Sequence, residues 1–169
     1  VFIQNREAEQ KYIDTINYFA QKLPDMKIYS MLIPTQLEFQ EEMYANIGDS
    51  QKDTIEYIYS KLDERIVTVD AYNALENHSD EYIYFRTDHH WTTLGAYYAY
   101  ADYMQSIGRE PQSLDSFEFV EVEDFLGTHY SKSKNFNVET DTLSYIKNDS
   151  QIDIMGTADS IYDYSKFET

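Results

Sequence analysis

The chain has 169 residues, enough for one domain with a real hydrophobic core, and an aromatic content of 16% excludes a disordered segment. Its 13 Lys and Arg are outnumbered by 31 Asp and Glu, giving a net charge of −18. Such a surface repels phosphate backbones, so we expect no nucleic-acid partner. Cysteine is absent, which excludes a disulfide framework and a cysteine-bound zinc site.

The first third of the chain predicts a helix followed by a strand. Apolar residues recur at helical spacing from about residue 5 to residue 23, and Pro24 ends the pattern. Residues 28–33 form a short apolar run ended by Pro34, which is typical of a buried strand. No run approaches the roughly 20 apolar residues that a membrane span needs, and no signal peptide is visible. We expect any targeting segment to lie upstream of residue 1.

The middle of the chain continues the alternation. Its patterns follow in the order helix, strand, strand and helix, at residues 51–62, 66–69, 82–85 and 93–106. Gly108 is the predicted C-cap of the last helix. Beyond residue 109 the pattern weakens, with strand-like runs at 117–122 and 152–155. This order predicts an α/β fold in which helices flank a parallel sheet.

The most informative stretch is the run Asp88-His89-His90-Trp91, which follows the predicted strand 82–85 and precedes a helix. In open α/β sheets, sites are built at the carboxyl ends of strands. Histidine supplies a general base near neutral pH. A carboxylate bonded to one ring nitrogen fixes the tautomer and stabilises the imidazolium that forms.

The spacing within this run predicts a contact between Asp88 and His90. Residues two apart in an extended chain point to the same side, so a slight turn brings the carboxylate to the ring, and His89 points the other way. Thr92 is the predicted N-cap of the following helix, whose dipole favours neutral imidazole. The alternative interpretation is that Asp88 caps a loop and the histidines are partly buried polar residues.

The nine residues from Tyr84 to Thr92 read Tyr-Phe-Arg-Thr-Asp-His-His-Trp-Thr and resemble the signature of the bacterial DHHW protein family. That family is related to the SGNH-like alginate O-acetyltransferases. Residues 125–128 and 130–133 are also similar to it. The resemblance implies a single SGNH-hydrolase-like domain over residues 1–169, with a parallel sheet flanked by helices, incomplete at both ends and part of a longer protein.

The same resemblance implies a function. It implies an extracytoplasmic protein, tethered to the membrane through a segment upstream of residue 1, that serves polysaccharide O-acyl transfer or ester cleavage without a cofactor. Its partners would be a cell-surface polysaccharide and a membrane-bound O-acyltransferase. In this interpretation Asp88 is the orienting acid and His90 the general base, which together supply half of a Ser-His-Asp triad.

The serine of that triad has no convincing place in the chain. The resemblance implies a Gly/Asp-Ser block after the Asp-His motif and behind an apolar strand. Residues 48–50 read Gly-Asp-Ser but precede the motif, and Ser50 or Asp49 is better interpreted as a helix N-cap. Ser160, behind the run 152–158, is the best remaining candidate. We therefore expect the nucleophile beyond residue 169 and an isolated chain that is inactive or nearly so.

Four further residues are candidates for substrate contact. Arg86 pairs with a carboxylate or holds a substrate oxyanion, and the sequence leaves both open. Trp91 is expected to pack beneath the motif, with stacking on a sugar as the alternative. His89 follows Asp88 directly, and His129 either lines the site or makes a local hydrogen bond in its loop.

Two other functions stay open at this point. A metal-dependent phosphoesterase could use Asp88, His89 and His90 as ligands, with Asp70 as the one obvious addition. A non-catalytic carbohydrate-binding domain is the other, since the aromatic content suits stacking on sugar rings.

Overall fold

A computed structural model describes residues 1–39 and 48–147. Its helices and strands are α1 (Arg6–Lys22), β1 (Ile28–Met31), α2 (Gln51–Tyr59), β2 (Ile66–Val69), α3 (Ala71–Glu76), α4 (Thr93–Ser106), β3 (Phe119–Phe125), α5 (Thr128–Ser133) and β4 (Asp141–Ile146). The α/β class predicted from the sequence is confirmed. No helix within the described residues is both long enough and apolar enough to cross a membrane.

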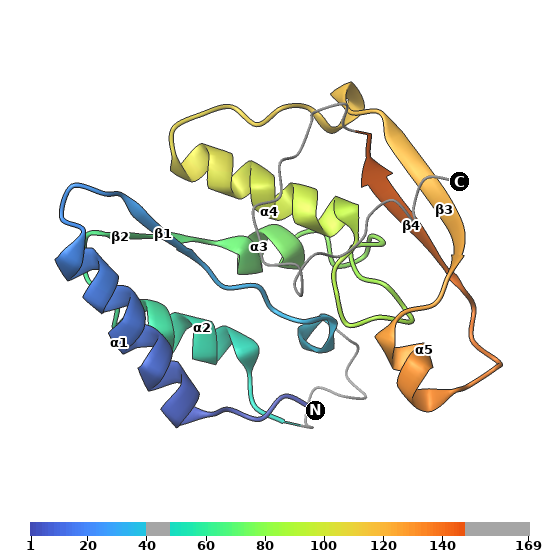
Figure 1. Cartoon of the computed structure of the whole chain (residues 1–169), viewed down its shortest axis with the longest axis horizontal. Helices are drawn as coiled ribbons and strands as arrows, with labels where there is room; N and C mark the ends of the chain where they lie inside the picture. Colours follow the sequence, from blue (N-terminus) through green and yellow to red (C-terminus); the bar gives the residue numbers. More distant parts are fainter. Residues whose placement is uncertain (40–47, 148–169) are drawn as a thin grey trace, which may run out of the picture.

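Strands β1 and β2 pair in parallel and form the centre of a three-layer arrangement (Figure 1). The Ser30 hydroxyl of β1 bonds to Tyr12 of α1 at 2.8 Å. The neighbouring Tyr29 instead packs its ring against Tyr103 of α4, with centroids 5.4 Å apart. Because successive side chains of a strand point to opposite faces, α1 lies on one face and α4 on the other.

The predicted bounds of α4 and β2 agree with the structure. Thr92 caps α4 by accepting a hydrogen bond from the Gly95 N–H. At the other end, Gly108 has φ +73°, and its N–H donates to Gln105 O at 2.9 Å. This left-handed residue ends the helix as predicted.

The predicted strand at 82–85 is wrong, and the parallel sheet has only two strands within the described residues. Ile83, Tyr84 and Phe85 are buried, as a strand pattern requires, but their backbone partners are local. Phe85 N–H donates to His90 O, and Ile83 O accepts from Thr92 N–H. The segment therefore pairs with its own return, leaving one isolated bridge between Tyr84 and Trp91. Burial and pairing are separate properties, and the apolar run predicts only the first.

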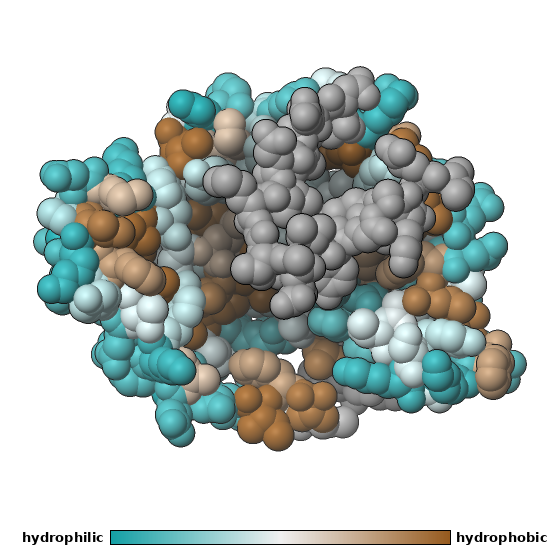
Figure 2. All heavy atoms as spheres, in the orientation of Figure 1, coloured by the Kyte–Doolittle hydropathy of each residue, from teal (hydrophilic) through white to brown (hydrophobic). Residues whose placement is uncertain are grey.

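The last third of the described chain forms an antiparallel pair, β3 with β4, beside α5 (Figure 1). The predicted strand 117–122 is observed as β3, which begins two residues later and ends three residues later. Strand β4 and the short helices α3 and α5 are not predicted, and His129 lies in α5 instead of the expected loop. The predicted strand 152–155 lies outside the described residues. In Figure 2, hydrophilic side chains make up most of the described outline, and the hydrophobic ones gather in separate patches, as the net charge of −18 suggests.

Candidate active site

The Asp-His motif occupies a loop that closes on itself. Backbone hydrogen bonds join Phe85 N–H to His90 O at 3.2 Å and Thr92 N–H to Ile83 O at 2.9 Å. These two bonds close the base of the loop, and Asp88 lies within the loop that they enclose. The first turn of α4 starts directly behind the loop, so both ends of the motif are anchored.

Asp88 and His90 are in direct contact. His90 Nδ1 lies 2.5 Å from Asp88 Oδ1, and the same oxygen accepts the His90 backbone N–H at 2.9 Å. A carboxylate only accepts, so in the neutral ring Nδ1 carries the proton and Nε2 keeps its lone pair. The Asp88 side chain is 6% exposed and that of His90 is 65% exposed. The pair therefore presents a basic nitrogen to solvent from a buried carboxylate, as a general base requires.

The second oxygen of Asp88 accepts the backbone N–H of Thr128, at 2.7 Å, from the first residue of α5. Burial by itself would raise the pKa of Asp88. The hydrogen bonds from the Thr128 and His90 backbones and from the His90 ring outweigh that effect and lower the pKa of Asp88 below its ordinary value. Asp88 is therefore ionised at neutral pH and available to stabilise an imidazolium.

A glycine makes the approach of α5 possible. A Cβ added at Gly127 would overlap the Cβ and the carboxylate of Asp88. Gly127 N–H in turn donates to the Thr87 hydroxyl at 2.9 Å. The sequence showed residues 125–128 as similar to the family but indicated no role for this position.

His89 does not point away from the pair, contrary to the prediction. Its ring centroid lies 3.8 Å from that of His90, and its Nδ1 is 2.7 Å from the Thr128 hydroxyl and 3.6 Å from Asp88 Oδ1. The alternation expected of an extended chain fails because the loop turns at these residues. His129, on α5, contributes a third ring with its centroid 6.1 Å from that of His89.

The remaining predicted residues lie around this loop. Trp91 is partly buried against the core cluster that includes Ile83, in agreement with the expected packing role. Arg86 lies over the Tyr82 ring at 4.9 Å, and its guanidinium is 3.9 Å from carboxylate oxygens of both Glu139 and Asp141. Of the two roles left open for Arg86, the structure shows pairing with carboxylates.

Asp141 also supports the site, although no sequence pattern points to it. It is the first residue of β4 and is fully buried, and its carboxylate accepts hydrogen bonds from the segment just before Asp88. A single Asp between two threonines carries no periodicity or motif that would indicate burial.

A metal site at the motif was one of the alternatives. Ligand atoms of Asp88, His89 and His90 lie within 4.8 Å of one another, in the one group of this kind among the described residues. Asp70, the suggested fourth ligand, instead caps α3 by accepting the Asn73 N–H at 3.1 Å. Asp88 Oδ1 already accepts both the backbone N–H and the ring Nδ1–H of His90, so that oxygen has no remaining lone pair for a cation. The geometry fits the hydrogen-bonded pair better than a metal centre.

Ser50 is a helix N-cap, as the sequence predicts. Ser50 caps α2 by accepting the Asp53 N–H at 3.1 Å, and Ser131 donates to Gly127 O. Over residues 1–39 and 48–147, no serine hydroxyl forms a hydrogen bond with His90. Ser160, the remaining nucleophile candidate, lies outside the described residues.

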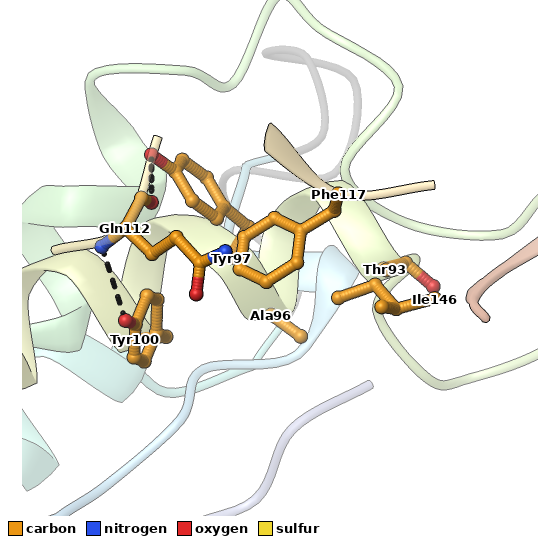
Figure 3. A pocket seen from close by; sticks show the side chains of 7 residues that line it. All are labelled: Thr93, Ala96, Tyr97, Tyr100, Gln112, Phe117 and Ile146. Atoms are coloured by element: carbon orange, nitrogen blue, oxygen red, sulfur yellow. Dashed lines mark hydrogen bonds between the residues drawn. The ribbon is translucent and has the colours of Figure 1, made fainter. Parts of the chain in front are cut away.

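A hollow of about 380 Å³ opens beside α4 (Figure 3). Its mainly apolar lining consists of Thr93, Ala96, Tyr97, Tyr100, Gln112, Phe117 and Ile146. Two of its tyrosines form hydrogen bonds with the backbone of Gln112: the Tyr97 hydroxyl donates to Gln112 O, and the Tyr100 hydroxyl accepts the Gln112 N–H. None of the motif residues 86–91 lines this hollow, so it is separate from the Asp-His pair.

Comparison with known proteins gives a family match over nearly the whole chain. The model of the DHHW protein family matches residues 3–168. Among solved structures, the fold is similar to a DHHW family protein from Eubacterium siraeum, with a TM-score of 0.75 and 33% sequence identity. That match covers 82% of this chain and 47% of the other. No curated protein sequence matches significantly.

Two more distant structures share the fold. Bacillus cereus PatB1 with a sulfonyl adduct has a TM-score of 0.68 at 17% identity, over 86% of this chain and 52% of that one. The O-acetyltransferase domain of Pseudomonas putida AlgJ has a TM-score of 0.62 at 14% identity, over 86% and 59%. The chain thus spans about half the length of the solved structures that it matches.

Proposed function

This chain belongs to the DHHW protein family, and from that premise we propose that it supplies the Asp-His half of a polysaccharide O-acetyltransferase or esterase. The observation that carries the proposal is the exposed His90 ring, whose Nδ1 is held by the buried Asp88 carboxylate at 2.5 Å. The similarity of the fold to the AlgJ O-acetyltransferase domain supports the choice of reaction.

In the proposed reaction, His90 Nε2 takes the proton of a serine hydroxyl while the serine oxygen attacks the acyl carbonyl carbon. The imidazolium, stabilised by Asp88, then protonates the departing oxygen of the donor, and an acyl-serine remains. A polysaccharide hydroxyl gives its proton to the same nitrogen and attacks the acyl-serine. Returning that proton to the serine releases the acylated polysaccharide, and water in place of the sugar gives ester cleavage.

We propose that the serine lies in a segment beyond residue 169, with Ser160 as the one candidate inside the chain. The support is that this chain covers 47–59% of the solved structures that it matches. In this proposal residues 1–169 are part of one SGNH-hydrolase-like domain. The β1–β2 pair, covered on both faces by helices, would then be part of a larger parallel sheet, since parallel sheets are normally buried on both sides.

The cellular setting follows from the same proposal. The substrate would be a polysaccharide outside the cytoplasm, and the acyl group would come from a membrane-bound O-acyltransferase. A tether upstream of residue 1 would hold the domain beside that partner. The acidic surface, with a net charge of −18, suits a neutral or basic glycan better than an anionic one.

The direct test compares this chain with a longer protein that contains it, using turnover of a soluble acetyl ester. The longer protein should hydrolyse the ester, and Asp88→Asn and His90→Ala should each abolish most of that activity. His78→Gln is the matched control, since His78 bonds to Glu81 and stacks on Tyr98 and makes no hydrogen bond to Asp88 or His90. A sulfonyl fluoride should modify one serine of the longer protein, to be located by mass spectrometry.

Two results would overturn parts of the proposal. Full activity of the His90→Ala variant in the longer protein would remove His90 from the chemistry. Robust turnover by residues 1–169 alone, lost in both variants, would instead show that the nucleophile is within this chain. Glycan binding that survives the loss of both Asp88 and His90, without any turnover, would favour the carbohydrate-binding alternative.

A further inference from the structure

We propose that Asp141 is a positioning residue that holds Asp88 in place for His90, through Thr87 and the start of α5. This inference rests on the proposed function, because it assumes that the Asp88–His90 pair is the working part of the site. Asp141 does not touch the pair. It acts on the chain segment just before Asp88 and on the segment that donates to Asp88.

The carboxylate of Asp141 is surrounded by donors from one short segment. Oδ1 accepts the Arg86 N–H at 2.9 Å and the Tyr82 hydroxyl. Oδ2 accepts the Thr87 N–H at 2.7 Å and the Thr87 hydroxyl at 2.5 Å. The Asp141 side chain is 0% exposed, so water cannot replace these bonds. Two consecutive backbone amides and two hydroxyls therefore depend on one carboxylate from β4.

Thr87 passes this constraint to α5. Its hydroxyl has one proton, which the bond to Asp141 uses, so the oxygen is free to accept the Gly127 N–H at 2.9 Å. The next amide, Thr128 N–H, donates to Asp88 Oδ2 at 2.7 Å. The Thr87 carbonyl also accepts the His129 N–H at 2.9 Å. Asp141 thus orients the Thr87 hydroxyl, which binds the residue just before α5. The first residue of α5 in turn binds Asp88 Oδ2.

The arrangement requires a carboxylate. An amide at position 141 would turn an NH2 group toward one pair of donors and leave buried N–H or O–H groups unpaired. Burial tends to raise the pKa of Asp141, but the hydrogen bonds from Thr87, Tyr82 and Arg86 lower it overall. The group is therefore charged and acts only as an acceptor, which fixes the direction of the Thr87 hydroxyl.

The experiment follows the His90 Nδ1–H proton by NMR in the 15N-labelled chain. Asp141→Asn and Thr87→Val should make this proton exchange with water about tenfold faster, the factor expected for losing one hydrogen bond of ordinary strength. Thr87→Ser keeps the hydroxyl and should restore the slow exchange. Tyr82→Phe is the matched control: it removes one bond to Asp141 but leaves the Thr87 link, so exchange should stay as in the wild type.

The outcomes separate this inference from the proposed function. If the wild type itself shows no slowly exchanging Nδ1–H at His90, the proposed Asp-His pair fails. If that proton is present and unchanged in folded Asp141→Asn or Thr87→Val protein, only the positioning role fails. If both variants unfold, backbone amide hydrogen exchange of the wild type provides the test instead. Thr87, Gly127 and Thr128 should then show one common protection factor, and clearly independent protection would contradict the proposal.

Discussion

Replacing Gly127 with alanine tests whether the start of α5 must pack directly against Asp88. The backbone at this position, φ −86° and ψ −160°, is open to alanine, so the substitution adds no conformational strain. The new Cβ would instead overlap both the Cβ and the carboxylate of Asp88. The start of α5 must then move away from the motif.

The cost follows from the bonds that this movement breaks. The Thr128 N–H to Asp88 bond has a charged acceptor and contributes about 2 kcal/mol, and the Gly127 N–H to Thr87 bond contributes about 1 kcal/mol. Alanine restricts the unfolded chain and offsets about 0.5–1 kcal/mol of that loss. We expect a net decrease of about 2 kcal/mol in the free energy of unfolding, measured by urea denaturation.

Gly108→Ala is the matched control for this experiment. Gly108 has φ +73°, and a Cβ there meets nothing within 4 Å, so the substitution costs about 1 kcal/mol of backbone strain without touching the motif. The Gly127 variant should also disturb the His90 Nδ1–H signal, and the Gly108 variant should leave that signal unchanged. A Gly127→Ala protein as stable as the wild type, with the signal intact, would refute the seating of α5 on Asp88.

Three further predictions follow from the same site. First, the folded-state pKa values of Asp88 and Asp141 are lowered, so their stabilising contribution is complete above the unfolded-state pKa of about 3.9 and is lost as pH falls through the folded-state values. Urea denaturation at a series of pH values from 6 down to acid should show the free energy of unfolding falling with pH. It should fall less steeply with pH in Asp88→Asn, and an unchanged pH dependence would contradict the assignment. Second, in a longer protein that hydrolyses acetyl esters, Asp88→Asn should lower kcat by about 10⁴-fold, the size expected when the base takes the wrong tautomer. A decrease of less than about tenfold would show that Asp88 does not orient the base. Third, treatment of that protein with a chelator should leave ester turnover unchanged, whereas loss of activity that Zn²⁺ or Mn²⁺ restores would favour the metal-dependent alternative at Asp88, His89 and His90.

The sequence predicted most of the regular elements because their signals are local. Helix α4 has an N-cap, an apolar pattern and a C-terminal glycine, and its bounds agree with the structure. Strand β2 is a short β-branched run with the same bounds as predicted. The segment 82–85 was misassigned because buried apolar residues look alike in a strand and in a closed loop. What separates the two is the backbone pairing with residues 90–92, which the apolar pattern does not show.

The candidate site was predictable in part for a similar reason. The contact between Asp88 and His90 depends on residues two apart in sequence, so the spacing was enough to predict it. Its supports come from far along the chain, since Thr128 lies 40 residues after Asp88 and Asp141 lies 54 residues after Thr87. Contacts at such separations depend on how β3, β4 and α5 pack, and no local pattern in the sequence encodes them.

The decisive measurement is the tautomer of His90, read from the 15N shifts of its ring across a pH titration of this chain. If Asp88 orients His90, the neutral form of the ring carries its proton on Nδ1 and leaves Nε2 unprotonated, and Asp88→Asn loses that preference. A neutral ring protonated on Nε2 in the wild type, or a tautomer that ignores the Asp88→Asn change, would contradict the claim that Asp88 prepares His90 as a base.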